Sequence, residues 1–422
     1  MTSVRWANPS TALRANDFIG DFGARVRETD HWAEVVAIVD VQKKARIFCN
    51  MSLSRFKGSL IGAVVADCIG ALFEGIRVVR LKDVLGVVEH KIEKARKIQK
   101  ESGTRPADVY GLQFTDDTAM ARSVAASLIE KDKLDARDLA HRFAEEFRSE
   151  PDRGYGGNVV TVLKALRDPD IEDVFKPASE QFDGSGSYGN GGAMRISPAP
   201  LFTFFDNDIT KLESLTDSIT RLTHTNPLAI HGAMLEVFAI DEIMRMSQGQ
   251  SIDVNKFLDS LIAKMKPIEE KSNDCSEPLA KKVVPKRPLD ADPTPYCAKL
   301  EKIKEFAFKE DLNASEVEAV LGNDVSALGS VPAAILSFVR QAVTPDPNME
   351  GRNEFERTVL YAISLGGDTD TIATMAAAIA GALYGAEQIP ESWQYYCEGV
   401  ADAETFAEKF FQRGQVQKVA QD

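Results

Sequence analysis

Three segments of this chain repeat apolar residues every three or four positions, the spacing that gathers side chains on one face of an α-helix. The repeated positions are Ile61, Val65, Ile69 and Phe73 in the first segment, Met120, Val124 and Leu128 in the second, and Ile372, Met375, Ile379 and Leu383 in the third. Alanine and glycine fill many positions between them, and small side chains let helices approach closely. Alternating apolar residues are scarce, and LFTFF at 201–205 is the best strand candidate. We therefore predict an all-α fold, a compact helical bundle.

Composition excludes several classes of protein. The 422 residues carry a formal net charge of −14, which argues against a broad nucleic-acid-binding surface. The five cysteines are widely spaced and contain no CxxC pair, so a disulfide framework or a thiolate zinc site is not expected. Apolar runs are too short for a membrane span. If the protein binds a metal, the ligands must be oxygens, which favours magnesium, calcium or manganese.

The chain divides into a long central domain and two terminal segments. Residues 1–50 are predicted to be an extension of uncertain order, and the acid-free start MTSVRWANPSTALRAN is similar to a mitochondrial presequence. A short extra helix is an equal alternative. The domain itself is predicted over 51–400, with a proline-rich surface excursion at 265–295, and residues 401–422 form a C-terminal tail.

Two short motifs place acids immediately before apolar helices. FTDDTAM contributes Asp116 and Asp117, and GGDTDTIATM contributes Asp368 and Asp370. An Asp or Thr at such a place often caps the first turn of the helix. One cap needs only one oxygen, however, and adjacent carboxylates repel unless a cation lies between them. The motifs are thus either helix caps or the two halves of a binuclear oxygen site.

Glycine-rich loops and one glutamate complete the candidate site. GYGGN at 154–158 and GSGSYGNGG at 184–192 would let the backbone approach a phosphate, although such loops are more often simple turns. Phe182 and Tyr188 could stack on a base or merely pack. Glu74 follows Asp67 by seven residues, so both could share a helix face, and a solvated helix end is the alternative.

Together these motifs resemble those of the ADP-ribosylglycohydrolase family. SRFKGSLIGAVVADCIGALFEG, FTDDTAMARSV, GYGGNVVTV, QFDGSGSYGNGGAMRISP, LTHTNPLAIHGA and SLGGDTDTIATMAAAIAGALYG occur in the family's order between about Ser54 and Trp393. GSYGNGGAM and LGGDTDTIATM are most similar to the magnesium-dependent branch that acts on serine-linked ADP-ribose, poly(ADP-ribose) and O-acetyl-ADP-ribose. The resemblance implies an orthogonal helical bundle with two Mg²⁺ ions in a cleft.

The resemblance also implies roles for individual residues. Glu74 matches the catalytic glutamate, on a loop that can close over the site. The matches to metal ligands are Thr115, Asp116, Asp117 and Asp370 for one ion, and Asp368, Asp370 and Thr371 for the other. The matches to substrate-binding positions are Gly154, Gly156, Phe182, Ser185, Gly186, Ser187, Tyr188, Gly189, Asn190, Gly191, His224 and Val325. From the residues alone, His224 reads as a satisfied polar residue and Val325 as core.

The implied activity is Mg²⁺-dependent hydrolysis of the glycosidic bond at C1″ of ADP-ribose. Expected partners are proteins modified on serine, poly(ADP-ribose) and O-acetyl-ADP-ribose, with no direct nucleic-acid binding and no membrane. The alternatives are an arginine-type ADP-ribosyl hydrolase, a non-catalytic ADP-ribose-binding relative and a metal-dependent phosphatase. A monomeric, intracellular enzyme is expected, in the nucleus and cytoplasm, with the mitochondrial matrix also open.

Overall fold

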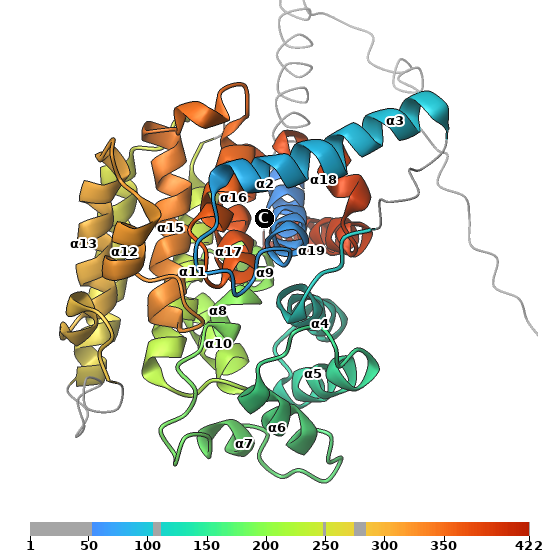
Figure 1. Cartoon of the computed structure of the whole chain (residues 1–422). Coiled ribbons are helices and arrows are strands. Elements are labelled where there is room, and N and C mark those ends of the chain that lie inside the picture. Colours follow the sequence, from blue (N-terminus) through green and yellow to red (C-terminus); the bar gives the residue numbers. More distant parts are fainter. Residues whose placement is uncertain (1–52, 104–110, 248–249, 274–283, 422) are drawn as a thin grey trace, which may run out of the picture. The chain divides into compact units, whose positions relative to one another are not determined.

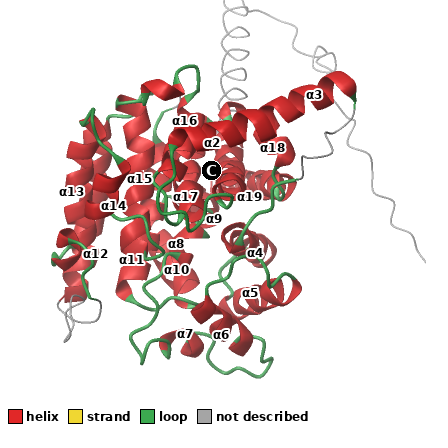
Figure 2. Ribbon diagram, viewed as in Figure 1, coloured by secondary structure: helices red, strands yellow, loops and turns green. Residues whose placement is uncertain are grey.

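The structure, a computed structural model, describes residues 53–103, 111–247, 250–273 and 284–421, and within these ranges it contains helices and loops but no strands (Figure 2). The predicted all-α fold is confirmed. The predicted extension over residues 1–50 lies outside the described residues. No described helix is long and apolar enough to cross a membrane.

The described part begins with a helix over residues 53–70. The α-helices that follow are α2 (Leu81–Val87), α3 (Lys94–Ser102), α4 (Asp116–Lys131), α5 (Ala136–Ser149), α6 (Gly157–Ala165), α7 (Lys176–Ser179), α8 (Gly191–Met194), α9 (Pro198–Thr203), α10 (Ile209–Arg221), α11 (Pro227–Arg245), α12 (Val254–Asn273), α13 (Pro295–Phe308), α14 (Ala314–Val320), α15 (Ala327–Val343), α16 (Glu354–Ser364), α17 (Thr369–Tyr384), α18 (Glu391–Tyr396) and α19 (Val400–Gln421). A π-helical segment, η1 (Val88–Glu93), joins α2 to α3, and short 3₁₀ turns are η2 (Phe204–Asp206), η4 (Pro288–Ala291), η5 (Pro347–Met349) and η6 (Ala386–Gln388).

Helix α17 lies at the centre of the bundle, where α11, α15 and α16 pack against it (Figure 1). Its first fourteen residues, Thr369–Ala382, are all buried. The sequence suits this position because ATMAAAIAGA offers mostly methyl-sized side chains, and three neighbouring helices can then approach one axis.

Glycines bring the helix over residues 53–70 into backbone contact with α17. A Cβ atom on Gly381 would lie 1.9 Å from the carbonyl oxygen of Gly58, and one on Gly70 would lie 2.6 Å from the Cα of Asp370. The two helices therefore run antiparallel along this seam. Because Gly70 meets the start of α17, the turn that follows Gly70 is held beside Asp370.

A second group of helices packs around α4. Helix α4 packs against α5, and α5 packs against α6. Helix α19 lies against α4, α9 and η2, and its Phe410 and Phe411 are buried. The segment 401–422, predicted to be a C-terminal tail, is thus helical through Gln421 and contributes to the core.

Two local features of the sequence are outweighed by tertiary packing. The strand candidate LFTFF at 201–205 is wrong, because Leu201 to Thr203 belong to α9 and the two following phenylalanines begin η2. The predicted excursion at 265–295 begins inside α12, which continues through Pro267 to Asn273. Buried apolar side chains such as Leu261 and Met265 hold α12 against α11 and α13. Residues 274–283 of the excursion lie outside the described residues.

Candidate functional site

The candidate site is a cavity of about 430 Å³ between α4, α17, the glycine-rich loops and the turn after Gly70. Its lining residues are Glu74, Asp116, Asp117, Met120, Gly154, Gly156, Gly157, Asn158, Val159, Phe182, Ser187, Tyr188, Gly189, Asn190, Gly191, Met194, His224, Val325, Asp368, Asp370 and Thr371. Seven stretches that are far apart in the sequence thus meet around one space. The volume suits a ligand of the size of a nucleotide.

Helix capping does not account for the acids at the two helix starts. Thr115 caps α4, since its hydroxyl oxygen accepts a hydrogen bond from the Asp117 N–H at 3.3 Å. Asp368 stands at the N-cap of α17, yet its side chain accepts no capping hydrogen bond. The carboxylates of Asp116, Asp117 and Asp368 are therefore free of the capping role and are directed to the cavity that they line.

Backbone hydrogen bonds hold the Glu74 turn against the start of α17. The N–H of Gly75 donates to the carbonyl oxygen of Gly367 at 2.9 Å. The N–H of Gly367 donates to the carbonyl oxygen of Ile76 at 3.0 Å. Carboxylate oxygens of Glu74, Asp368 and Asp370 consequently lie within 4.8 Å of one another. Glu74 is exposed and the two aspartates are buried.

The structure does not separate Glu74 in space from the acids that were predicted to hold metal. Glu74, which matches the family's catalytic glutamate, has a carboxylate oxygen within 4.8 Å of those of Asp368 and Asp370. Exposure distinguishes it instead, because its turn is reached by solvent while Asp368 and Asp370 lie in the interior.

Burial makes this group of acids unfavourable when all are charged. Burial, then the charges of Asp67 and Asp368, raises the pKa of Asp116 to about 8. Burial, then the charges of Asp368 and Glu74, raises the pKa of Asp370 to about 10. Burial also raises the pKa of Glu74, with Asp368 and Asp67 acting in the same direction. A cation among these oxygens would remove the repulsion and restore their charge.

The donor set fits a hard divalent cation such as Mg²⁺. All candidate ligands are oxygens, and Oδ2 of Asp117 is buried without a hydrogen-bond partner among the described residues. The other oxygen of Asp117 accepts a hydrogen bond from the Thr371 hydroxyl at 3.3 Å. An unpartnered buried carboxylate oxygen is costly, and a divalent cation bound beside it would supply the missing partner.

Asp67 supports the site from behind, a role that its place in the sequence does not reveal. Its fully buried carboxylate accepts hydrogen bonds from the backbone N–H groups and the hydroxyls of Thr115 and Thr118, at 2.6–3.2 Å. These bonds tie the first turn of α4 to the helix over residues 53–70. The Thr115 hydroxyl donates to Asp67, and Thr115 does not line the cavity.

The glycine-rich loop contributes part of its predicted residues to the cavity wall. Ser187 to Gly191 line it, whereas Ser185 and Gly186 do not. The Ser185 carbonyl accepts a hydrogen bond from the Asn226 side chain at 3.0 Å, and Gly186 has φ +71° with Thr225 against it. These two residues shape the loop behind the wall. Phe182 and Tyr188 do line the cavity, with ring centroids 6.2 Å apart.

A loop over residues 321–326 connects the glycine-rich loop to the start of α17. The N–H of Asp368 donates to the carbonyl oxygen of Asn323 at 2.9 Å, and the N–H of Asn190 donates to that of Val325 at 3.0 Å. The Asn190 side chain donates in turn to Asp368 at 2.6 Å. Val325, read from sequence as core, is 64% exposed and lines the cavity.

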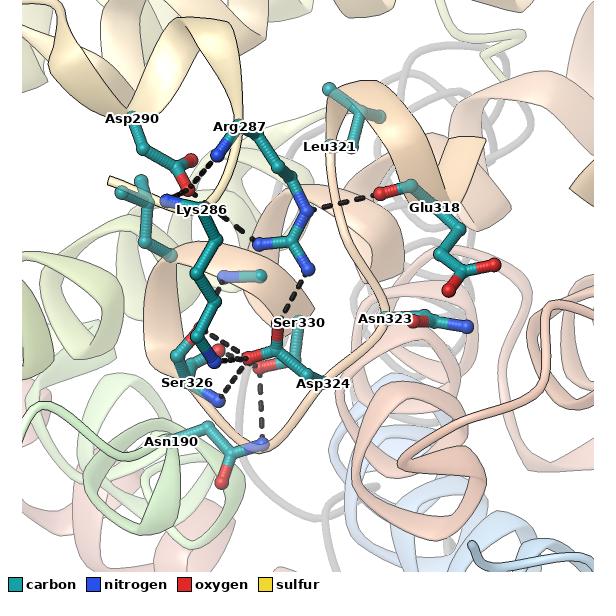
Figure 3. A network of polar contacts seen from close by, with 12 residues as sticks. Asn190, Lys286, Arg287, Asp290, Glu318, Leu321, Asn323, Asp324, Ser326 and Ser330 are labelled. Carbon is teal, nitrogen blue, oxygen red and sulfur yellow. Dashed lines mark hydrogen bonds and ion pairs between the residues drawn. The ribbon is translucent and has the colours of Figure 1, made fainter. Parts of the chain in front are cut away.

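Polar contacts from outside the cavity hold this loop in place (Figure 3). The guanidinium of Arg287 donates to Asp324 and, through Nε, to the carbonyl oxygen of Glu318 at 3.0 Å. Asp324 also accepts a hydrogen bond from the Ser326 N–H at 2.9 Å. The sequence signal for these residues was slight, an Asn-Asp-Val-Ser run before an apolar helix, in which Ser326 caps α15.

Comparison with known proteins accounts for this arrangement. A sequence profile described as ADP-ribosylglycohydrolase matches residues 50–420. The chain belongs to this family. It is 42% identical over 359 residues to ADP-ribosylhydrolase ARH3 of Homo sapiens, covering 85% of this chain and 93% of the human protein. The same-named protein of Xenopus tropicalis is 41% identical over 85% of this chain and 95% of its own.

More distant relatives share the fold. An uncharacterized protein of Escherichia coli, YegU, is 29% identical over 80% of this chain and 90% of its own length. A solved structure described as an ADP-ribosylglycohydrolase-related protein complex superposes with a TM-score of 0.55 at 21% identity, over 86% of this chain and 99% of that one. Family membership makes this chain a hydrolase of glycosidic bonds, and the cavity is its candidate active site.

Proposed function

We propose that this ADP-ribosylglycohydrolase uses Mg²⁺ to hydrolyse the O-glycosidic bond at C1″ of ADP-ribose. Its substrates are proteins modified on serine, poly(ADP-ribose) and O-acetyl-ADP-ribose. The observation that carries the proposal is the meeting of Glu74 with carboxylates from two helix starts inside one cavity. The similarity to proteins named ADP-ribosylhydrolase supports the substrate class.

The ends of the cavity suit the two ends of the substrate. The first turn of α6, after Gly156, offers N–H groups to the diphosphate, and the loop from Ser187 to Gly191 lines the cavity wall. Phe182 and Tyr188 offer aromatic faces to the adenine base. Asp116, Asp117, Asp368, Asp370 and Thr371 would hold the metal ions, and with them the terminal ribose.

Cleavage of a glycosidic bond passes through an oxocarbenium-like state. We assign Glu74 the general acid/base role, because it is the solvent-exposed carboxylate of the acidic group, and partial burial with the nearby charges of Asp368 and Asp67 raises its pKa. When bound, Mg²⁺ supplies positive charge that orients the ribose hydroxyls and polarises water. The Thr115–Asp67 hydrogen bond holds the start of α4 in place. The Gly75–Gly367 hydrogen bond holds the Glu74 turn beside the start of α17.

Mass spectrometry of the products tests the proposal. A serine-ADP-ribosylated peptide and an arginine-ADP-ribosylated peptide are incubated with the full chain, with Mg²⁺ and with EDTA. The proposal predicts unmodified peptide and free ADP-ribose from the serine substrate in Mg²⁺ alone. Release from the arginine peptide only, or equal release in EDTA, would contradict it. Intracellular location, in the nucleus and cytoplasm, belongs to the same proposal and is tested by imaging the tagged protein.

A further inference from the structure

Behind the glycine-rich loop, a buried arginine, a threonine and a histidine form a hydrogen-bonded chain that ends at the cavity. Nη2 of Arg195 donates to the hydroxyl oxygen of Thr223 at 2.7 Å and to the carbonyl oxygen of Ile219 at 3.0 Å. The Thr223 oxygen lies 2.7 Å from Nδ1 of His224. Arg195 and Thr223 are fully buried, and His224 is 7% exposed and lines the cavity.

Packing holds the hydrogen-bonded series Arg195–Thr223–His224 in one geometry. The Arg195 guanidinium lies over the ring of Phe143, 4.7 Å from its centroid. The carbonyl oxygen of Thr223 accepts a hydrogen bond from the Gln181 side chain at 2.7 Å. The imidazole lies directly against the glycine-rich loop, since a Cβ atom on Gly191 would come within 2.6 Å of Cε1 of His224.

Proton accounting fixes the direction of each hydrogen bond. A guanidinium can only donate, so the Thr223 oxygen accepts from Arg195 and its single hydroxyl proton remains to be placed. If Nδ1 of His224 carried a proton, Thr223 would accept twice, and its own buried proton would have no acceptor among its contacts in the described residues. The hydroxyl proton therefore goes to Nδ1, which is an acceptor.

The imidazole is neutral in this environment. Burial, then the charge of Arg195, lowers the pKa of His224 to about 3. A neutral imidazole has one ring N–H, and with Nδ1 accepting, the proton is on Nε2. Among the described residues no hydrogen-bond partner of Nε2 is found.

We propose that Arg195 and Thr223 are positioning residues that fix His224 in the Nε2–H tautomer, so that it donates a hydrogen bond to an oxygen atom of the bound ligand. Ligand oxygens of ADP-ribose are acceptors, and its phosphate oxygens are also negatively charged. In the opposite tautomer Nε2 would present a lone pair to those oxygens and repel them. A neutral imidazole donates this hydrogen bond without adding a full positive charge to the cavity. This inference rests on the proposed function for the identity of the ligand.

The chain offers a matched control for Thr223. Thr220, one turn earlier, is also fully buried, but its hydroxyl has no hydrogen-bond partner among the described residues. Thr223→Val and Thr220→Val each remove one threonine hydroxyl at nearly constant side-chain volume. Only Thr223→Val removes the contact with His224. Thr223→Ser retains the hydroxyl. His231, whose Nε2 lies 3.0 Å from the Ser272 hydroxyl, is an internal reference ring.

The test is ¹⁵N NMR of the histidine side chains, in which protonated and unprotonated ring nitrogens resonate at separate frequencies. The His224 signals are assigned by their loss in His224→Asn. We expect Nε2 protonated and Nδ1 unprotonated in the wild type and in Thr223→Ser. In Thr223→Val the two nitrogens should move toward a tautomer mixture, while His231 stays unchanged. Protonation of Nδ1 in the wild type, which requires no variant to fold, would overturn the inference.

Calorimetric titration with ADP-ribose gives the second readout. Thr223→Val should bind ADP-ribose about 10-fold more weakly, and Thr220→Val and Thr223→Ser should stay within about twofold of the wild type. Equal weakening in both valine variants would assign the effect to packing and overturn the inference. Failure of the wild type to bind ADP-ribose contradicts the proposed function instead, and the tautomer measurement still decides the roles of Arg195 and Thr223.

Discussion

Glu74 differs from its acidic neighbours in the way that it is held. Its position depends on a turn pinned by two backbone hydrogen bonds, whereas Asp117 and Asp370 lie in the first turns of long helices. A carboxylate on an exposed turn can reach a substrate oxygen and exchange protons with solvent, and a buried one in a helix cannot do so as readily. This difference supports the roles that we propose, acid/base catalysis at Glu74 and metal binding at the aspartates.

Substitution Glu74→Gln tests that division of roles. Glutamine keeps the shape but loses the proton-transfer group, so we expect the rate of ADP-ribose release to fall by about 10²-fold or more. Because Glu74 is exposed, Mg²⁺ affinity should fall less than in Asp370→Asn. Single-turnover hydrolysis and Mg²⁺ titration measure the two effects. Hydrolysis at the normal rate in Glu74→Gln would show that the role is misassigned.

At the scale of elements, the glycine pair before α17 determines where three segments meet. Gly367 has φ +75°, and a Cβ atom there would lie 2.1 Å from the carbonyl oxygen of Asn323. The same residue exchanges hydrogen bonds with the Glu74 turn. Only glycine permits both the left-handed backbone and the close approach.

We therefore predict a large cost for Gly367→Ala. Left-handed strain contributes about 1–2 kcal/mol, and the clash adds to it, so we expect a loss of unfolding free energy above about 3 kcal/mol. Gly351→Ala is the control, because Gly351 has φ +84° with no atom within 4 Å of the Cβ position. Denaturant unfolding compares the two variants. Equal losses would mean that the contact with Asn323 does not matter.

The loop over residues 321–326 gives a prediction with a pH dependence. Although burial alone would raise it, hydrogen bonds from Ser326 and Arg287 hold the pKa of Asp324 below its ordinary value. The ionised carboxylate is thus bound more favourably in the folded state. Its contribution is fully present above the unfolded pKa of about 4 and is lost as pH falls through the lower folded value.

Substitution Asp324→Asn should then reduce stability by about 1–2 kcal/mol at pH 7. The difference from the wild type should stay constant between about pH 5 and 8 and shrink below about pH 4. Urea unfolding at several pH values measures it. A difference that grows on acidification would contradict the role given to the Arg287–Asp324 contact.

At the scale of the whole molecule, local sequence patterns predicted much of the fold, but they predicted few of the residues that hold the site in place. The start of α4 and the burial of α17 followed from acids placed before apolar periodicity, and small residues in the segment 59–75 predicted close helix contacts. LFTFF failed because its composition suits either structure, and packing against α10, α11 and α19 decides for a helix. Helix α12 continues past Pro267 because its apolar face is buried.

The supporting residues could not be found in this way because their partners are distant in sequence. Asp67 meets Thr115 across 48 residues, and Asn190 meets Asp368 across 178. From its neighbours in the sequence alone, each of these residues is indistinguishable from an ordinary polar residue in a helix or a loop. Arg195 and Thr223 are likewise invisible until burial shows that their polar atoms need one another.

The molecule as a whole carries a net charge of −14 and still gathers several buried acids around one cavity. When these acids are ionised, their mutual repulsion opposes folding, and a bound cation would compensate the charge. A ligand that binds only the folded state stabilises it, by about 2.7 kcal/mol at a hundredfold excess over Kd. The central claim is therefore that acids from α4 and α17 hold Mg²⁺ jointly.

Calorimetric titration of Mg²⁺ into the wild type, Asp117→Asn and Asp370→Asn tests this claim most directly. The two acids belong to different helices, and each substitution leaves the candidate ligands of the other helix in the sequence. We predict that either substitution alone weakens Mg²⁺ binding by at least about 10-fold, since both helices contribute ligands to the same site. Unchanged Mg²⁺ affinity in either variant would contradict the account.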